Sequence, residues 1–251
     1  MKTNTFTNIF ILILSIFQVG ILFLPYIIYK FINTNSTRIT NLTLQTNLTT
    51  NTAISAFLDY NFIWCFIFLS FLIISINNFV VNNSFNLSLI YNLIIIFVLN
   101  ISYIMLRQSS NLQLYSLLPL ILTTFYSLYT LHKIKNQTLI NFNQSRLYNI
   151  GYSITASFLV FLSFDSSLEL INTLGYSEYI TTNPIKVYLT IWLYAIFSSM
   201  VYIKLQSKLF LITSISIILI VFINSSVHTN KELIISSFSC FLVLLYLLFT
   251  N

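Results

Sequence analysis

Few residues of this chain could move a proton, and those that could lie beside long apolar segments. Asp165 and Glu169 are four residues apart near the end of one segment, so a helix that continues this far places both on one face. Arg107 ends another segment, directly after Ile-Met-Leu. A charge at the centre of a bilayer costs about 3 kcal/mol or more, so all three are candidates for proton transfer. The preferred interpretations are simpler: a solvated helix end for the two acids, and for Arg107 a stem that snorkels to the membrane surface.

The remaining reactive side chains show no arrangement typical of a catalytic or metal site. Cys65 and Cys240 lie within apolar stretches without a second cysteine or a histidine nearby, which predicts burial. His132 and His228 fall in predicted loops and lack the spacing of metal ligands. Three glycines in the whole chain cannot build a phosphate-binding or dinucleotide-binding loop. The sequence therefore predicts no cofactor, no metal and no catalytic site.

Composition places the chain in a membrane. Hydrophobic residues make up 57% of it and charged residues only 6%, whereas a soluble domain carries about 25% charged residues. The net charge of +6 comes from residues scattered at segment ends, so nucleic-acid binding is not expected. Alanine and glycine, which usually mediate packing of membrane helices, are scarce. Codon supply from an AT-rich genome explains this, so we expect a mitochondrially encoded protein, with an AT-rich bacterium or endosymbiont as the alternative.

The apolar segments predict an all-α fold: a single polytopic membrane domain over residues 1–251, built from about eight transmembrane helices. A span needs about 20 mainly apolar residues to cross about 30 Å of hydrocarbon. Pro25 and Pro119 are expected inside spans, where they would kink the helices. A Thr/Asn-rich loop is expected at 33–52. The predicted spans are 6–31, 56–80, 87–106, 112–131, 147–170, 185–205, 209–223 and 233–250.

Alternating spans distribute the charges unequally between the two membrane sides. All five acids fall on one side, together with Lys30, Arg38, Arg107, Lys186 and Lys231. The other side receives only positive charges, and it has one more Lys or Arg than the first. Positive charges accumulate on the inner side, so this second side is expected in the matrix of a mitochondrion, with both termini there and the chain in the inner membrane. Its basic residues are Lys2, Lys133, Lys135, Arg146, Lys204 and Lys208.

Two stretches resemble NADH dehydrogenase subunit 2, the antiporter-like membrane subunit of respiratory complex I. That family has an apolar helix ending in Lys-Ile-Lys-Arg, then Leu-Ala-Tyr-Ser-Ser and a step to Gly-Tyr. A second stretch, from Ile191, resembles the family's Ile-x-x-Tyr-Ala pattern. The matching residues are Lys133, Ile134, Lys135, Leu139, Phe142, Ser145, Ile150, Gly151 and Tyr152, and then Tyr194 and Ala195.

The resemblance implies a membrane-arm subunit of complex I, in contact with other membrane subunits and lipids, with a structural or proton-translocation role. The proton-pathway candidates would be Lys133, Lys135, Arg107, Glu169 and Asp165. The family's intramembrane lysine before the Lys-Ile-Lys turn is missing, because the sequence reads LNISYIMLRQ there. The proline-rich stretch of a later helix is also absent, and the spans are fewer. The resemblance then implies a truncated or split subunit whose role is largely structural.

Two other classes remain open. Leu106, Arg107 and Asn111 match the Leu-Arg-x-x-x-Asn pattern of ATP synthase subunit a, although five predicted spans follow Arg107 where that family has one long hairpin partner. A lineage-specific scaffold subunit of another respiratory-chain complex would explain the shortage of intramembrane charges. The discriminating feature is whether Lys133 and Lys135 lie at a helix break facing other charges or at an ordinary helix end.

Overall fold

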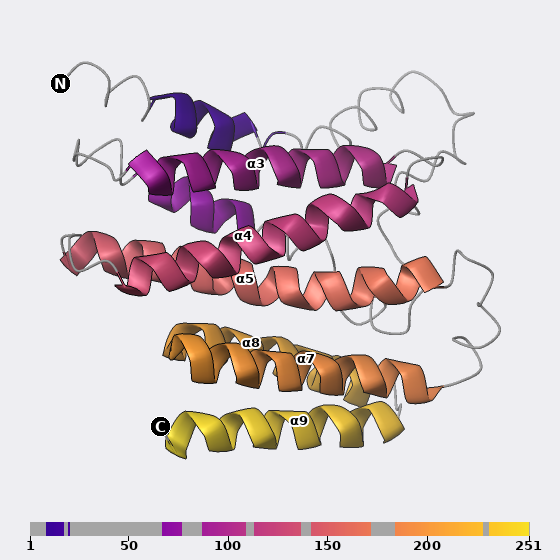
Figure 1. The fold of residues 1–251 in the computed structure, drawn as a ribbon. Helices are drawn as coiled ribbons and strands as arrows, with labels where there is room; N and C mark the ends of the chain where they lie inside the picture. The colour runs from indigo at the N-terminus through magenta and orange to yellow at the C-terminus, as the bar shows by residue number, and fades with distance from the viewer. Residues whose placement is uncertain are drawn as a thin grey trace, which may run out of the picture.

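The computed structural model describes residues 9–17, 20, 67–76, 87–108, 113–136, 142–171, 184–227 and 231–250. This part of the chain consists of helices and short connections (Figure 1). Helical stretches at 9–17 and 67–76 precede the labelled elements. These elements are α3 (Leu87–Gln108), the 3-10 turn η1 (Gln113–Ser116), α4 (Leu117–Asn136), α5 (Phe142–Ile171), α7 (Pro184–Leu205), α8 (Lys208–Val227) and α9 (Lys231–Thr250).

The predicted all-helical class is confirmed in the part of the chain that the structure describes. Within the described residues, four helices are long and apolar enough to cross a membrane, at Leu114–Asn136, Leu147–Ser167, Tyr188–Leu205 and Leu233–Thr250. Shorter apolar helices cover Ile67–Ile76, Tyr91–Arg107 and Lys208–Ile223. The predicted loop at 33–52, Pro25, and the outer parts of the predicted spans 6–31 and 56–80 lie outside the described residues.

The predicted ends of the spans agree with the observed ends of α7 and α9 to within two residues, but those of α4 are off by five. Pro184 opens α7, a position where its fixed φ suits a helix and its missing N–H is not needed. The span predicted at 112–131 instead divides into η1 and a helix that runs on to Asn136. Pro119 therefore lies in the first turn of α4, where no intrahelical hydrogen bond is lost. Pro119 lies inside the span Leu114–Asn136, as predicted, but so close to the start of α4 that the helix needs no kink.

Helix α5 lies at the centre of the bundle. Chain neighbours pack antiparallel: α3 on α4, α4 on α5, and α8 on α9 (Figure 1). α5 also packs on α8 and α7, and α9 packs on both α7 and α8. Because α8 runs back between them in sequence, α7 and α9 point in the same direction (Figure 1). Helix α5 therefore contacts α4, α7 and α8 directly, and α3 and α9 pack on these neighbours.

The core on the α5 face is aromatic. Phe71 packs edge-on against Phe97 and Tyr152, with ring centroids 5.3 Å and 5.6 Å apart. Phe161 of α5 packs edge-on against Tyr194 of α7 at 5.4 Å. These geometries place the positive ring edge on a negative ring face, which adds about 1 kcal/mol per pair to the burial of the rings. The aromatic contacts thus join residues 67–76 and α7 to opposite sides of α5.

Gly151 lets residues 67–76 approach α5 closely. A Cβ added at this position would collide with Cδ1 of Ile74, lie 3.3 Å from its Cγ1 and lie 3.6 Å from the backbone oxygen of Ser70. Small residues at helix interfaces allow such close approach in membranes. Packing therefore explains Gly151 without the expected resemblance to subunit 2.

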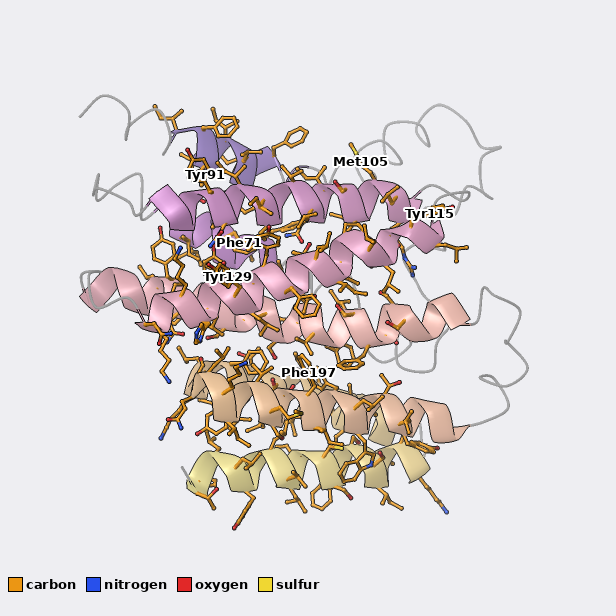
Figure 2. All side chains as sticks on the ribbon, in the orientation of Figure 1. Phe71, Tyr91, Met105, Tyr115, Tyr129 and Phe197 are labelled. Atoms are coloured by element: carbon orange, nitrogen blue, oxygen red, sulfur yellow. The ribbon has the colours of Figure 1, made fainter. Side chains whose placement is uncertain are left out.

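The outer surface of the bundle is strongly apolar. Met105, Tyr115 and Tyr129 are more than half exposed, and Figure 2 shows such side chains around the helices. Phe249, at 80% exposed, is the extreme case among the described residues. A soluble protein rarely exposes contiguous apolar patches of this extent, whereas lipid tails solvate them. The surface therefore supports a membrane location.

Candidate functional site

Two of the predicted site residues are buried at the same end of the bundle. Arg107 lies in the last turn of α3 and is only 5% exposed. Asp165 is 0% exposed, two residues before the apolar stretch of α5 ends at Ser167. The C-terminal ends of α3 and α5 lie at one end of the bundle, with the start of α4 between them (Figure 1). A buried carboxylate and a buried guanidinium therefore share this end.

This burial corrects two sequence-based interpretations. Asp165 was expected at a solvated helix end, but α5 continues to Ile171 and its side chain lies inside the bundle. Arg107 was expected to snorkel to the membrane surface, but its side chain is enclosed by protein. A charge withdrawn from solvent is costly unless other groups compensate it, so both residues have protein surroundings that stabilise them. Glu169 follows Asp165 by one turn of α5, and its side chain lies outside the described residues.

Lys133 and Lys135 lie at the opposite end, in the last turn of α4. The ammonium group of Lys135 donates a hydrogen bond of 2.7 Å to the backbone oxygen of Leu205, the last residue of α7. This oxygen belongs to a helix C-terminus, which carries partial negative charge and favours a cation. Nζ of Lys133 lies 6.0 Å from the ring centroid of Tyr129 on the same helix. Helix α4 is continuous from Leu117 to Asn136, so the two lysines end a helix and do not mark a break.

The five predicted proton-pathway residues therefore do not form one line across the membrane. α4 runs from the Arg107 end of the bundle to the Lys135 end, about 30 Å for its 20 residues at about 1.5 Å per residue. Lys133 and Lys135 occupy one end of this distance. Asp165 and Arg107 occupy the other, with Glu169 next to them on the α5 backbone. Proton transfer between the two groups would need intermediate carriers.

Hydroxyl groups, which sequence analysis missed, occupy the interior between the two ends. The Ser157 hydroxyl of α5 lies 3.0 Å from the Tyr194 hydroxyl of α7 and 2.8 Å from that of Ser214 in α8. One turn earlier, Ser153 lies 3.0 Å from Ser207 at the α7–α8 connection. All five residues except Ser207 are completely buried. The i, i+4 spacing of Ser153 and Ser157 was the available signal, but it does not stand out in a chain so rich in serine.

Further hydroxyl pairs join α5 to the helices before it. Thr124 of α4 lies 2.9 Å from Ser163, and Ser70 lies 3.2 Å from Thr155. Each of these pairs contains a hydroxyl that also bonds to a backbone oxygen of its own helix, as Thr124 does to Leu120. Interhelical hydrogen bonds of this kind stabilise membrane bundles by roughly 0.6 kcal/mol each. The hydroxyl pairs therefore explain the packing of α5 without any catalytic role.

Comparisons with protein families, curated proteins and solved structures find no match to this chain.

Of the thiol and imidazole groups, the structure describes those of Cys240 and His132, and these two add no second site. Cys240 is free and buried, as predicted, whereas Cys65 and His228 lie outside the described residues. His132 was predicted in a loop, but it lies on α4, exposed, with Nε2 3.1 Å from Nδ2 of Asn136. Among the described residues, no group of three His, Cys, Asp or Glu side chains could hold a metal ion. The candidate site is thus the buried Arg107 and Asp165 end.

Proposed function

We propose that this chain is a structural subunit of the membrane part of a respiratory-chain complex, embedded in the mitochondrial inner membrane among other membrane subunits and lipids. The observation that carries the proposal is the contact of Lys135, whose ammonium group donates a hydrogen bond to the C-terminal carbonyl of α7. A proton-translocating lysine must be able to release its proton, whereas a capping lysine stabilises the fold in its charged form. Lys133, on an aromatic ring at the same helix end, fits the same structural role.

The proposal includes about eight membrane spans. Four helices meet the length and apolar composition of a span. Helices α3 and α8 contain 22 and 20 residues, and at about 1.5 Å per residue each is about as long as the hydrocarbon core is thick. The apolar segments predicted at 6–31 and 56–80 complete the number. The basic ends of α4, α7 and the start of α8 would face the matrix.

Complex I is the first candidate for the assembly. The resemblance to subunit 2 supports it, through Lys133, Lys135, Gly151 and Tyr194. Three of these residues have packing roles here: Lys135 caps α7, Gly151 admits residues 67–76, and Tyr194 bonds to Ser157. A subunit that keeps these positions and lacks the intramembrane lysine fits a structural role. A scaffold subunit of another respiratory-chain complex and ATP synthase subunit a are the alternatives.

The assembly can be identified directly. Membranes are extracted in mild detergent, respiratory complexes are separated on a native gel, and mass spectrometry locates the chain. Co-migration with NADH dehydrogenase activity is the expected result. Co-migration with ATP hydrolysis would overturn the proposal and make Arg107 the central residue. Another respiratory-chain complex would exclude complex I and leave the scaffold role in that complex, and migration apart from all of them would refute the proposal.

If the lysines are structural, their substitution should change the amount of assembled complex but not the number of protons moved per electron. Lys135→Met removes the cap of α7, so we expect less assembled complex, with the number of protons moved per electron unchanged in the complex that remains. Lys133→Met is the matched control at the same helix end. The Lys133 ammonium group lies over the Tyr129 ring of its own helix, so its removal should lower assembly less. A reduced proton-to-electron ratio in Lys135→Met would contradict the structural role.

A second candidate function, proton transfer at the Arg107 end, is favoured by the burial of Asp165. A carboxyl group in protein interior near a membrane boundary can take up and release a proton if water reaches it. Asp165→Asn keeps the shape and removes the titration. In this second case, the assembled complex would move fewer protons per electron at normal abundance. With a purely structural role, the ratio stays normal.

A further inference from the structure

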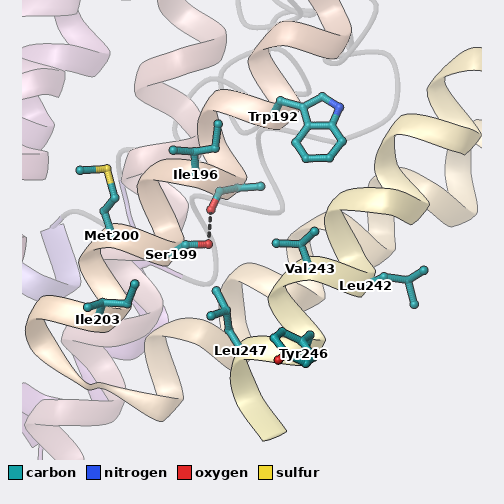
Figure 3. Close-up of a pocket in the computed structure, with 10 residues that line it drawn as sticks. Trp192, Ile196, Ser199, Met200, Ile203, Leu242, Val243, Tyr246 and Leu247 are labelled. Atoms are coloured by element: carbon teal, nitrogen blue, oxygen red, sulfur yellow. Dashed lines mark hydrogen bonds between the residues drawn. The ribbon is translucent and has the colours of Figure 1, made fainter. Parts of the chain in front are cut away.

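The surface between α7 and α9 contains an apolar groove of about 550 Å³ (Figure 3). Trp192, Met200 and Ile203 line it from α7, and Val243 and Tyr246 from α9. Its volume lies within the range of about 300–1,000 Å³ that is usual for small-molecule sites. We propose that this groove binds one acyl chain of an anionic phospholipid, whose phosphate lies at Lys204. The inference requires a membrane around the bundle but no particular respiratory complex.

The length and position of the groove match one membrane leaflet. From Trp192 to Ile203 there are eleven helical steps, roughly 16 Å at about 1.5 Å per step. This is about half the thickness of the hydrocarbon core. The groove lies along the half of α7 that ends at Leu205, so it extends from the lysine end of the bundle to about mid-membrane. A partner helix would instead use the full length of α7, including the exposed Leu189.

The lining of the groove suits hydrocarbon. Apart from the polar atoms of the Trp192 and Tyr246 rings, Ser199 carries the polar group of the lining, and its hydroxyl donates a 2.8 Å hydrogen bond to the backbone oxygen of Ala195 (Figure 3). The hydroxyl therefore has its hydrogen-bond acceptor within α7 and needs no partner in the groove. Ala195 and Ser199 are small, which deepens the floor between the larger Trp192 and Met200. A flexible acyl chain can fill this space without leaving the Ser199 hydroxyl unpaired.

The charge at the end of the groove selects the headgroup. Lys204 follows Met200 by four residues, so it lies on the same face of α7, one turn closer to the helix end, and it is exposed. Lys208 at the start of α8 is also exposed at this end. The acidic residues within the described ranges lie at the other end of the bundle from Lys204. They are Asp165 and Glu169 near the end of α5, and Glu232 at the start of α9. Because Lys135 already neutralises the C-terminal end of α7, Lys204 is left to attract a phosphate.

The test uses the fluorescence of Trp192. The second tryptophan is removed by Trp64→Phe, and the full chain is reconstituted in nanodiscs of phosphatidylcholine with a minor fraction of brominated phosphatidylglycerol or brominated phosphatidylcholine. Bromine at mid-chain quenches a nearby tryptophan. We expect much stronger quenching by brominated phosphatidylglycerol. Lys204→Gln should weaken this preference roughly fivefold, since one lysine near an anionic surface contributes about 1 kcal/mol.

Matched controls separate the groove from general effects. Lys231→Gln removes an exposed lysine at the other end and should leave the preference unchanged. Ser199→Phe fills the groove and should abolish the preference. Ser239→Phe is its control, because Ser239 has the same 2.8 Å bond to the carbonyl four residues earlier but lies outside the groove. Native mass spectrometry of the same detergent-solubilised variants counts bound phosphatidylglycerol, and it gives the answer through Lys204→Gln if Ser199→Phe fails to fold.

Three results would overturn the proposal. One is equal quenching by the two brominated lipids in the parent chain. Another is a preference that survives either Lys204→Gln or a folded Ser199→Phe. The last is efficient cross-linking between two copies through Met200→Cys and Tyr246→Cys in nanodiscs, which would make the groove a contact between copies of this chain.

Discussion

Tyr194 illustrates how single polar side chains are accommodated inside the bundle. It is completely buried, yet its hydroxyl lies 3.0 Å from Ser157, which also reaches Ser214. In hydrocarbon no water can replace a lost partner, so such hydroxyls must be placed opposite one another. Their net contribution is nevertheless modest, because the unfolded chain in the membrane also finds partners.

Tyr194→Phe tests this interaction. The substitution keeps the ring that packs on Phe161 and removes only the hydroxyl. We expect the free energy of unfolding in mild detergent to fall by about 1 kcal/mol. Tyr246→Phe, at a residue 69% exposed to lipid, is the control and should change it by less than about 0.5 kcal/mol. Equal effects of the two substitutions would show that the buried hydroxyl is not stabilising.

Gln206 is strained by the tight connection between α7 and α8. Its φ is 49°, in the left-handed region, and its N–H bonds to the Tyr202 oxygen at 2.5 Å. The next residue, Ser207, caps α8 by accepting a 3.4 Å hydrogen bond from the Phe210 N–H. A left-handed conformation costs a residue with a side chain roughly 1–2 kcal/mol, whereas glycine adopts it freely.

Gln206→Gly is therefore expected to stabilise the protein. Part of the relieved strain is offset by the greater freedom of glycine in the unfolded chain, which leaves a gain of about 0.5–1 kcal/mol in the free energy of unfolding. Ser207→Gly at the adjacent residue should have the opposite effect, because it removes the cap of α8 and the bond to Ser153. A loss of stability in Gln206→Gly would refute the strain.

At the scale of elements, the contact between residues 67–76 and α5 depends on one glycine. Gly151→Leu should lower the free energy of unfolding by about 1–3 kcal/mol, because its side chain must displace Ile74. Ile74→Ala should recover part of this loss in the double variant, although it is destabilising alone. A thermal unfolding series of the four proteins measures the coupling. Additive losses would mean that Gly151 and Ile74 do not meet.

The sequence predicted elements better than contacts. Apolar length alone placed the span 185–205 within one residue of the start of α7, so local signals were sufficient there. η1, Gln113–Ser116, was missed because the predicted span 112–131 took these residues into one helix, and only the turn geometry differs. The burial of Arg107 and Asp165 was missed because it depends on the packing of α3, α4 and α5 together. Lys135 was singled out, but its partner, a backbone oxygen 70 residues away, has no sequence signal.

At the scale of the whole molecule, the helix directions fix which residues share a membrane side. Lys204 and Lys208 lie at one end of the bundle, and Lys231 at the other (Figure 1). In sealed membrane vesicles that contain the chain, Lys204→Cys and Lys208→Cys should react with a membrane-impermeant thiol reagent from the same side. Lys231→Cys should react only from the opposite side. The parent chain gives the background reaction of its native cysteines. Labelling of all three from one side would contradict the transmembrane arrangement of α8.

The central position of α5 constrains how the chain enters a membrane. Of its apolar stretch, 67% is buried inside the bundle, against 22% for Leu233–Thr250 of α9. Synthesis proceeds from the N-terminus, so α4 is present to receive Ser163 when α5 emerges, but the partners of Ser153 and Ser157 on later helices are not yet made. We therefore expect α9 to insert without delay and α5 to complete its contacts only after α8 has been synthesised.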